Sequence, residues 1–311
     1  MTVLQDRLVD YLALRRSLGH KLATAGRDLE RFVVYLDHVG AQTVTLAATL
    51  AFVLDPDVDP VSSIGVKRLA AVRGFARHLS GIDPTTEIPP AGLVSYRARR
   101  RVPHLFTDDE INLLMATTAA SARTPQRSAM LQALIALLAV TGMRVGEAIR
   151  LERADIDWNE AVITIRATKF GKSRQVPVST STIDGLSVYA RVRDNAHPEP
   201  AASNVFISGN GTPVAYSHFC LTFRRAIDTA GIGDPARERR PRIHDLRHSF
   251  AVRTLVGWHR DGLDVGALLP RLSTYLGHRE PRYTYRYLTA TPELLGHAAT
   301  MLEADGAEKN R

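Results

Sequence analysis

Hydrophobic positions recur at a spacing of three to four residues along the first part of the chain. This pattern predicts amphipathic helices over residues 2–18, 23–39 and 62–80, with a shorter helix near 44–54. A turn-rich break is expected at 55–60, because each of its two prolines disfavours a helical residue before it. The N-terminal part is therefore predicted to be a small helical unit.

A stretch rich in proline and arginine follows at 81–104. Such a segment would be semi-extended and suited to crossing a phosphate backbone. The sequence therefore predicts a helical domain over 1–95, a basic linker over 96–104 and a second domain over 105–311. The candidate DNA-contacting residues of the linker are Arg97, Arg99, Arg100 and Arg101.

Helical patterning returns at the start of the second domain. Thr107 and Glu110 have the spacing of a capping box, which predicts a helix start. A helix is expected over 127–140, and Thr141-Gly142 should end it sharply. Another helix is expected from Arg144 to about Glu152.

Alternating hydrophobic residues then predict a small β-sheet. Strands are expected at 161–165 and 174–178, with residues 169–173 as the hairpin tip between them. Residues 156–158 are a candidate third strand, and helical patterning resumes from 181. The expected fold class is mainly α with a small antiparallel β-sheet (α+β).

The composition is that of a globular protein, with 45% hydrophobic and 23% charged residues among 311. The single cysteine, Cys220, excludes an internal disulfide and fits a reducing compartment. No run approaches the about 18 consecutive apolar residues of a membrane span, and the N-terminus does not resemble a signal peptide. A cytoplasmic protein without a membrane partner is expected.

The formal net charge is +8, and its distribution is uneven. Residues 1–95 hold ten Lys/Arg and ten Asp/Glu, so the thirty against twenty-two in residues 96–311 carry the whole excess. A basic half of this kind suits a polyanion, most commonly DNA or RNA. A solubilising surface charge is the alternative interpretation.

The helix over 62–80 carries a basic side. Lys67, Arg73 and Arg77 fall within an arc of roughly 140° at about 100° per residue, and could lie along DNA. A solvated helix face is the competing interpretation. The opposite side carries Ile64, Leu69, Val72, Phe75 and Leu79.

The candidate chemistry is concentrated between His244 and Tyr287. His244 and Arg247 are three residues apart, so they share one helix face. His278 and Tyr287 follow within a short distance along the chain. Cationic and imidazole groups around a phenol suggest nucleophilic attack on an anionic centre, most plausibly a phosphate. Tyr283 and Tyr285 are rival nucleophiles, and packing is the alternative role of all three tyrosines.

Arg144 follows a glycine turn at the start of a helix. Its planar guanidinium matches two phosphate oxygens, and Glu147 on the next turn could hold it in place. An ordinary surface ion pair is the alternative. Lys169 or Lys172 at the hairpin tip could act as a general acid, and Lys172 is also a candidate DNA contact, although two lysines in a turn more often face solvent.

Two other kinds of site are excluded by the residues at key positions. His244 and His248 have the separation of zinc-binding histidines, but Asp245 replaces the required glutamate and Arg247 would repel a cation. No metal is expected. Glycine-rich segments at 171–173 and 209–211 lack the full phosphate-loop and dinucleotide patterns.

Together these residues resemble those of the tyrosine recombinase (phage integrase) family. The resemblance rests on Thr141-Gly-Met-Arg144-Val-Gly-Glu147, the Lys169 hairpin, His244-Asp-Leu-Arg247-His248, Leu276-Gly-His278 and Tyr287. It covers roughly residues 103–300 and, less specifically, the helical N-terminal region. Each motif alone is modest, whereas five in the family's order and spacing are highly specific. The run after Tyr287 is more similar to transposon-borne integrases than to Xer resolvases.

The resemblance implies a role for each motif residue. Arg144 and Arg247 would clamp the scissile phosphate, supported by Glu147. The hairpin lysine, Lys169 with Lys172 in reserve, would protonate the departing 5′-hydroxyl. The remaining roles would be proton transfer for His244, a hydrogen bond to the phosphate for His278, and a 3′-phosphotyrosine bond for Tyr287. His248 is expected to be structural.

The resemblance further implies an assembly on DNA. A helical SAM-like core-binding domain and the catalytic domain would close as a C-shaped clamp on double-stranded DNA, in the nucleoid, without metal, ATP or other cofactor. Recombination would use a homotetramer on paired sites, with or without a sister recombinase. A C-terminal helix within 291–311 could pack into a neighbouring protomer or onto its own domain. A type IB topoisomerase and a catalytically inactive DNA-binding accessory protein are the alternative functions.

Overall fold

The fold is taken from a computed structural model that describes residues 2–56, 62–94, 102–166, 173–233, 240–278, 280 and 282–287. It divides into two compact units, residues 1–101 and 102–311. The basic run of the linker, the hairpin tip with Lys169 and Lys172, and the C-terminal stretch from 288 lie outside the described residues. No helix in the described part of the chain is long and apolar enough to cross a membrane.

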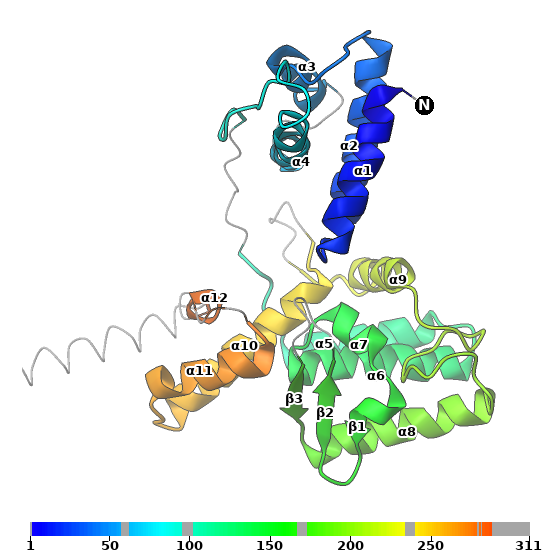
Figure 1. Cartoon of the computed structure of the whole chain (residues 1–311). Coiled ribbons are helices and arrows are strands. Elements are labelled where there is room, and N and C mark those ends of the chain that lie inside the picture. Colours follow the sequence, from blue (N-terminus) through cyan, green and yellow to red (C-terminus); the bar gives the residue numbers. More distant parts are fainter. Residues whose placement is uncertain are drawn as a thin grey trace, which may run out of the picture. The chain divides into compact units, whose positions relative to one another are not determined.

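The N-terminal unit is built from helices whose apolar sides face one core, as their spacing predicts (Figure 1). Phe32 and Phe75 are fully buried at its centre. Gly74 in the last helix allows a close approach of the first, because a Cβ there would lie 2.9 Å from Tyr11 Oη. The helices are α1 (Val3–Ser17), α2 (Ala23–His38), α3 (Leu46–Val53) and α4 (Ile64–Leu79).

Helix α4 departs from the sequence expectation at two positions. Ile64, assigned to the packed side, is exposed at the first turn, where the helix extends past the core. Arg68 is buried instead: it donates to Phe52 O at 3.1 Å and its guanidinium lies 4.7 Å from the centre of the Phe52 ring. Its Nη1 also pairs with Asp55 Oδ2 at 3.3 Å, so a carboxylate balances the charge while the aliphatic stem packs against the apolar core.

The second unit begins with the expected capping box, in which Thr107 and Glu110 each accept the other's backbone N–H. The long helix α6 (Pro125–Thr141) lies at the centre of its core and packs against α5, α8 and α10. The other helices are α5 (Asp108–Ala120), α7 (Val145–Arg150), α8 (Thr180–Ala196), α9 (Tyr216–Thr229), α10 (Ile243–Arg260), α11 (Val265–Leu276) and α12 (Arg282–Tyr285), with a 3-10 turn, η1 (Arg153–Asp155).

The predicted sheet is present as three antiparallel strands in the order β1-β2-β3. Its strands are β1 (Ile156–Asp157), β2 (Val162–Ile165) and β3 (Arg174–Pro177), and Ile163 pairs with Val176 in the register between β2 and β3. Strand β3 contacts α11, and Figure 1 shows α10 and α11 side by side next to this end of the unit. The sheet thus brings the base of the hairpin to the helices that carry the histidine motifs.

Helix α6 ends at Gly142 in a left-handed turn with a φ of 59°. A Cβ at this position would lie 2.6 Å from Phe250 Cδ1. Gly142→Ala should therefore reduce the free energy of unfolding by about 2 kcal/mol or more, from backbone strain and displacement of the ring. Urea unfolding followed by tryptophan fluorescence measures this unit alone, since both tryptophans, Trp158 and Trp258, lie in it.

The matched control is Gly185→Ala, in the middle of α8, where a Cβ would meet nothing within 4 Å. Alanine there should stabilise the unit by up to about 1 kcal/mol, because it favours helix over glycine. Equal stability of Gly142→Ala and the wild-type chain would contradict the account of the turn.

Candidate active site

Two left-handed turns frame the candidate site. One is Gly142 after α6; the other is Gly277 after α11, with a φ of 68°. In the second turn, the N–H groups of Gly277 and His278 donate to Thr274 O and Ser273 O, both at 2.9 Å, which closes the helix end. The backbone carbonyls of these turns point toward arginine side chains that come from other elements.

Arg247 links the two turns from the first part of α10. Its Nη1 donates to Gly142 O at 2.8 Å and its Nη2 to Leu276 O at 2.7 Å. Only 2% of the residue is exposed. Burial, with a smaller contribution from Arg144, lowers the pKa of Arg247 to about 10, so it remains charged near neutral pH.

Arg144, just before α7, also binds the turn that follows α11. Its Nη2 donates to Gly277 O at 3.0 Å, the carbonyl next to the one that Arg247 binds. Its Nη1 donates to Glu147 Oε1 at 2.8 Å. The side chain of Arg144 is 41% exposed, so the guanidinium has room for a ligand. The two predicted phosphate-binding arginines thus lie together at one turn.

Glu147 is buried rather than part of an exposed surface pair. Its Oε2 accepts the backbone N–H of Arg144 at 3.0 Å, and it also accepts both Nη groups of Arg174, at 3.2 and 2.8 Å. Burial alone would raise its pKa, but the hydrogen bonds and charge of Arg174, together with the bonds from Arg144, lower the pKa of Glu147 to about 2. The carboxylate stays ionised.

Arg174 was not among the candidate site residues predicted from the sequence. It begins β3, and its Nε also donates to Tyr275 O at 2.9 Å. One signal was available: side chains two apart on a strand face the same way, and Val176 is buried. Arg174 therefore had to point inward, where an arginine needs partners.

The aromatic side chains of the site form a continuous series of ring contacts. The His248 ring lies edge-on to His244 at 5.0 Å between centroids, and to Tyr287 at 5.3 Å. The Tyr287 ring stacks on His278 at 6.0 Å and an interplanar angle of 22°. Tyr287 also acts on the pKa of Arg247, which it raises against the effect of burial. His244, His278, Arg247 and Tyr287 thus lie in one cluster.

His278 is oriented from its Nδ1 side, which lies 2.8 Å from the hydroxyl of buried Thr284. Burial and then the charges of Arg247 and Arg144 lower the pKa of His278 to about 3. The pKa of His244 falls to about 4, first from burial and then from His248 and Arg247. The His244 side chain is nonetheless exposed to solvent on one side. Both imidazoles are neutral near pH 7.

The three candidate tyrosines differ in their surroundings. Tyr287 is 5% exposed and packs in the core of α10 and α11, whereas Tyr283 is 39% and Tyr285 52% exposed. Tyr283 reaches His278 edge-on at 6.3 Å. Of the three, Tyr287 is the one that contacts both His248 and His278, which favours the residue chosen from the sequence.

Charge at the site is out of balance. Arg144 and Arg174 share one carboxylate, Glu147, whereas Arg247 donates to neutral carbonyls, so three guanidinium groups come together with one bonded carboxylate among the residues that the structure describes. Such an arrangement suits an anion and opposes a metal cation. Among the described residues, no group of three or more His, Cys, Asp or Glu side chains could hold a metal ion.

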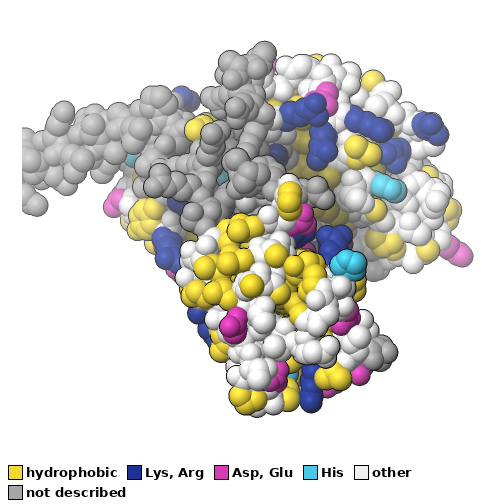
Figure 2. Space-filling view, turned by 90° about the horizontal axis from the view of Figure 1, so that it is seen from above, with side chains coloured by type: hydrophobic (Ala, Val, Ile, Leu, Met, Phe, Trp, Pro, Cys, Tyr) yellow, Lys and Arg dark blue, Asp and Glu magenta, His cyan; other side chains and the backbone are white. Residues whose placement is uncertain are grey.

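Two of the three basic residues predicted on α4 line a groove of the N-terminal unit. Lys67 and Arg77, both exposed, border a groove of about 710 Å³ along α1, α2 and α4, together with Arg15 and His78. Arg73 is half-buried. Figure 2 shows Lys and Arg side chains at the surface, with hydrophobic side chains exposed among them.

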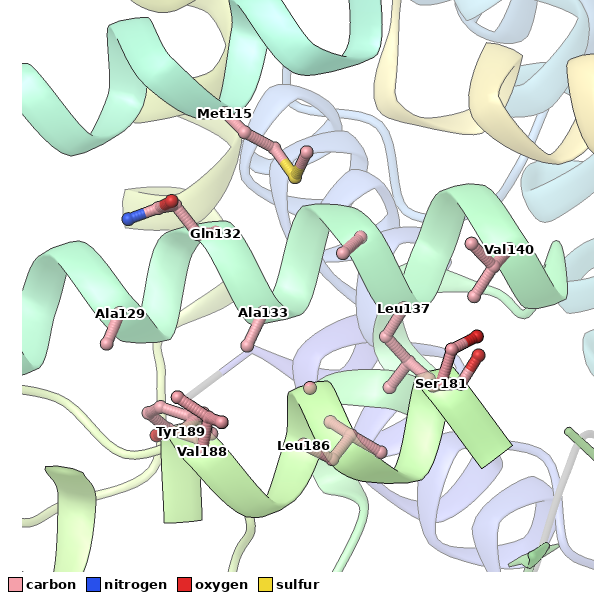
Figure 3. A pocket seen from close by; sticks show the side chains of 13 residues that line it. Met115, Ala129, Gln132, Ala133, Leu137, Val140, Ser181, Leu186, Val188 and Tyr189 are labelled. Carbon is pink, nitrogen blue, oxygen red and sulfur yellow. The ribbon is translucent and has the colours of Figure 1, made fainter. Parts of the chain in front are cut away.

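A second hollow, of about 370 Å³, lies between α6 and α8 of the second unit (Figure 3). Met115, Leu137 and Leu186 are among its lining residues, and none of the lining side chains is charged. The arginines and histidines of the candidate site do not line it, so this apolar groove is separate from that cluster.

Several solved structures share the fold. The XerH site-specific recombinase bound to palindromic difH substrate matches with a TM-score of 0.66 at 19% identity, over 90% of this chain and 79% of that one. The Tn1549 transposon integrase in complex with transposon right end DNA gives 0.65 at 17% identity, over 98% and 99%. A lambda integrase tetramer bound to a Holliday junction gives 0.64 at 15% identity, over 91% and 76%.

The neutral histidines make stability depend on pH. Their pKa values are lowered by folding, so the unfolded chain binds more protons between the ordinary value of 6.5 and the folded values of about 4 and about 3. The free energy of unfolding should therefore fall as pH is lowered from 7 to 5.

His278→Asn should flatten this dependence of the free energy of unfolding on pH, measured by urea unfolding with tryptophan fluorescence. His218→Asn, on the exposed side of α9, is the control. Parallel pH profiles for all three chains would contradict the assignment.

Comparison with known sequences agrees with the site. The family model described as "Phage integrase family" matches residues 104–293, which contain every residue of the cluster. A protein of Sinorhizobium fredii named as an integrase/recombinase is 37% identical over 308 residues, covering 97% of this chain and 98% of its own length. The chain belongs to the phage integrase family of tyrosine recombinases.

Proposed function

We propose that this chain is a site-specific DNA recombinase that cleaves and rejoins strands through a 3′-phosphotyrosine bond to Tyr287. The observation that carries the proposal is the meeting of Arg144 and Arg247 at consecutive carbonyls of one turn, beside the ring series that holds Tyr287. A DNA phosphate is the anion that this excess of positive charge would receive.

The proposed cleavage step is a transesterification. Tyr287 Oη attacks the scissile phosphorus, a bond forms between them, and the bond from phosphorus to the 5′-oxygen breaks. The guanidinium groups of Arg144 and Arg247 neutralise the charge that builds on the non-bridging oxygens. Because one phosphodiester replaces another, the bond energy is kept and no ATP is needed. Rejoining is the same step in reverse, with a 5′-hydroxyl of the partner strand as nucleophile.

Two protons must move in this step. The phenol proton passes to His244, which is neutral near pH 7 and therefore able to accept it. The bound phosphate supplies negative charge, which would raise the pKa of His244 and make it a better base. His278 donates a hydrogen bond to the phosphate, and Lys169, with Lys172 in reserve, gives a proton to the departing 5′-oxygen.

Tyr287 must be uncovered before it attacks. Its ring is buried among α10 and α11, whereas Arg144 and His244 are open to solvent. Attack requires the short segment that follows His278 to bring the hydroxyl toward a phosphate held by Arg144. DNA binding is the event that would supply this phosphate.

The proposal extends to DNA binding and assembly. A core-binding domain over 1–95, a linker over 96–104 and a catalytic domain over 105–311 would hold double-stranded DNA as a clamp. Lys67, Arg73 and Arg77 would contact its backbone with the linker arginines. Exchange of strands between two sites needs a homotetramer, with or without a sister recombinase, acting at the nucleoid. The lambda integrase tetramer on a Holliday junction, which shares the fold, supports this arrangement.

Expression of the tagged chain, denaturing capture and sequencing of covalently attached DNA test the proposal. Tyr287→Phe should abolish the covalent adduct while leaving DNA binding intact, because it removes only the nucleophilic oxygen. Tyr285→Phe, on the exposed neighbouring tyrosine, is the matched control and should keep the adduct. An adduct that persists in Tyr287→Phe and disappears in Tyr285→Phe would overturn the assignment.

The recovered sequence also separates a recombinase from a topoisomerase. A nicked duplex carrying that sequence should accumulate the adduct, and a scrambled duplex should not. On this duplex, Arg144→Ala and Arg247→Ala should each slow adduct formation roughly a hundredfold or more, as expected for lost transition-state donors. Equal cleavage of both duplexes, with relaxation of any supercoiled DNA, would point instead to a topoisomerase.

A further inference from the structure

We propose that Arg174 is a positioning residue for the cleavage step, and that it acts on Arg144 through Glu147. The inference rests on the proposed function, since it concerns the orientation of a phosphate-binding group. Arg174 is the first residue of β3, and its side chain reaches the turn after α11. Its three nitrogens are committed to protein partners, so its guanidinium is not left to bind DNA itself.

The orientation of Arg144 depends on a carboxylate that Arg174 holds. Glu147 Oε1 accepts Arg144 Nη1 at 2.8 Å and Arg174 Nη1 at 3.2 Å. Its Oε2 accepts the Arg144 backbone N–H at 3.0 Å and Arg174 Nη2 at 2.8 Å. The carboxylate is therefore fixed from two sides. Without Arg174 it could rotate, and Arg144 would lose its fixed partner.

The third nitrogen of Arg174 ties the same carboxylate to the second turn. Nε donates to Tyr275 O, one residue before the carbonyl that Arg247 binds and two before the one that Arg144 binds. Three successive carbonyls, 275 to 277, thus accept from three arginines. Arg174 therefore connects Glu147 to these three carbonyls, and His278 is the next residue along the chain.

Gly277 gives independent evidence that Arg174 belongs to this turn. A Cβ on Gly277 would lie 2.6 Å from Arg174 Nη1 and 2.8 Å from its Cζ. The guanidinium therefore lies flat against the turn at a place where a side chain would displace it. The glycine serves both the left-handed backbone and the contact with Arg174.

Lysine cannot replace arginine in this position. Its single ammonium is a point charge, whereas the guanidinium offers a rigid fork to the two oxygens of Glu147 and a third donor to Tyr275 O. Arg174→Lys keeps the positive charge beside Glu147, so the buried carboxylate stays paired and the unit should fold. The orientation of the network is what this variant removes.

Arg174→Lys should therefore slow covalent adduct formation about tenfold to a hundredfold on the nicked duplex that carries the recovered site, with DNA affinity changed less than about twofold. Urea unfolding by tryptophan fluorescence checks folding. The control is Arg166→Lys, at the other end of the hairpin, where the arginine is exposed and paired with Asp155; it should cleave at the wild-type rate. Wild-type cleavage by a folded Arg174→Lys chain would refute the inference.

A double-mutant cycle tests the route through Glu147. If Arg174 acts through this carboxylate, Glu147→Gln and Arg174→Lys remove the same orientation, so the double variant should be no slower than the slower single variant. Multiplied effects in the double variant would show that Arg174 acts by another route and would contradict the proposal.

The competing route runs through the hairpin, because Arg174 is five residues from Lys169 in the sequence. A duplex with sulfur in place of the bridging 5′-oxygen distinguishes the two routes, since a thiolate leaves without a proton donor. Cleavage of this duplex should stay slow in Arg174→Lys and recover in Lys169→Ala. Recovery in Arg174→Lys would mean that it positions the lysine, against our proposal. Failure of the wild-type chain to form any adduct would instead contradict the proposed function.

Discussion

The structure of the candidate site depends on three arginines that share one carboxylate and a short row of backbone carbonyls. Arg144 and Arg174 both donate to Glu147, and these two and Arg247 also donate to carbonyls of residues 275–277, with Arg247 donating to Gly142 O as well. A carbonyl dipole satisfies the donors of a guanidinium but does not cancel its charge. The network is therefore rich in hydrogen bonds and still positive. In the proposed function, that remaining charge would attract the phosphate of a DNA strand.

The same charge explains the state of the histidines. Arg247 and Arg144 add to burial in lowering the pKa of His278, and Arg247 does so for His244. Both imidazoles are consequently neutral when the site is empty. A bound phosphate would offset the positive charge of the arginines and so raise the pKa of both imidazoles. The proton acceptor would therefore be a stronger base when the DNA is bound. Binding and proton transfer are linked through one electrostatic balance.

The fold serves this site by bringing short motifs to two turns. The end of α6 and the start of α7 supply residues 142–147, β3 supplies Arg174, α10 supplies Arg247, and the end of α11 supplies 275–278. Each turn needs glycine, for a left-handed φ and because a neighbouring side chain occupies the space of a Cβ. Much of the architecture was accessible from the sequence, because hydrophobic periodicity, the Thr107 capping box and the alternation of the strands are local signals. The Arg144, His244 and Arg247 motifs could be found because residue type and spacing within a helix are also local.

Strand alternation indicated that Arg174 faces inward, but its partners could not be found in this way, since the carboxylate of Glu147 and the carbonyl of Tyr275 are far away in the sequence. The burial of Arg68 against Phe52 was not predicted, for the same reason. The hydrophobic pattern of a sequence identifies which face of a strand or helix is buried. It does not identify which distant hydrogen-bond acceptor lies against that face. The contact between the rings of His248 and Tyr287 likewise joins residues that are far apart in the sequence.

The most direct test of the account is the protonation of His278 and His244, followed by NMR of the imidazole signals in the Tyr287→Phe chain. Without DNA, both should titrate well below the ordinary value of 6.5, near the pKa values of about 3 and about 4. Binding of a duplex that carries the recovered site should move both upward. Imidazole pKa values near 6.5 in the free chain, or pKa values that do not change when DNA binds, would contradict the claim that an uncompensated cluster of arginines binds a DNA phosphate.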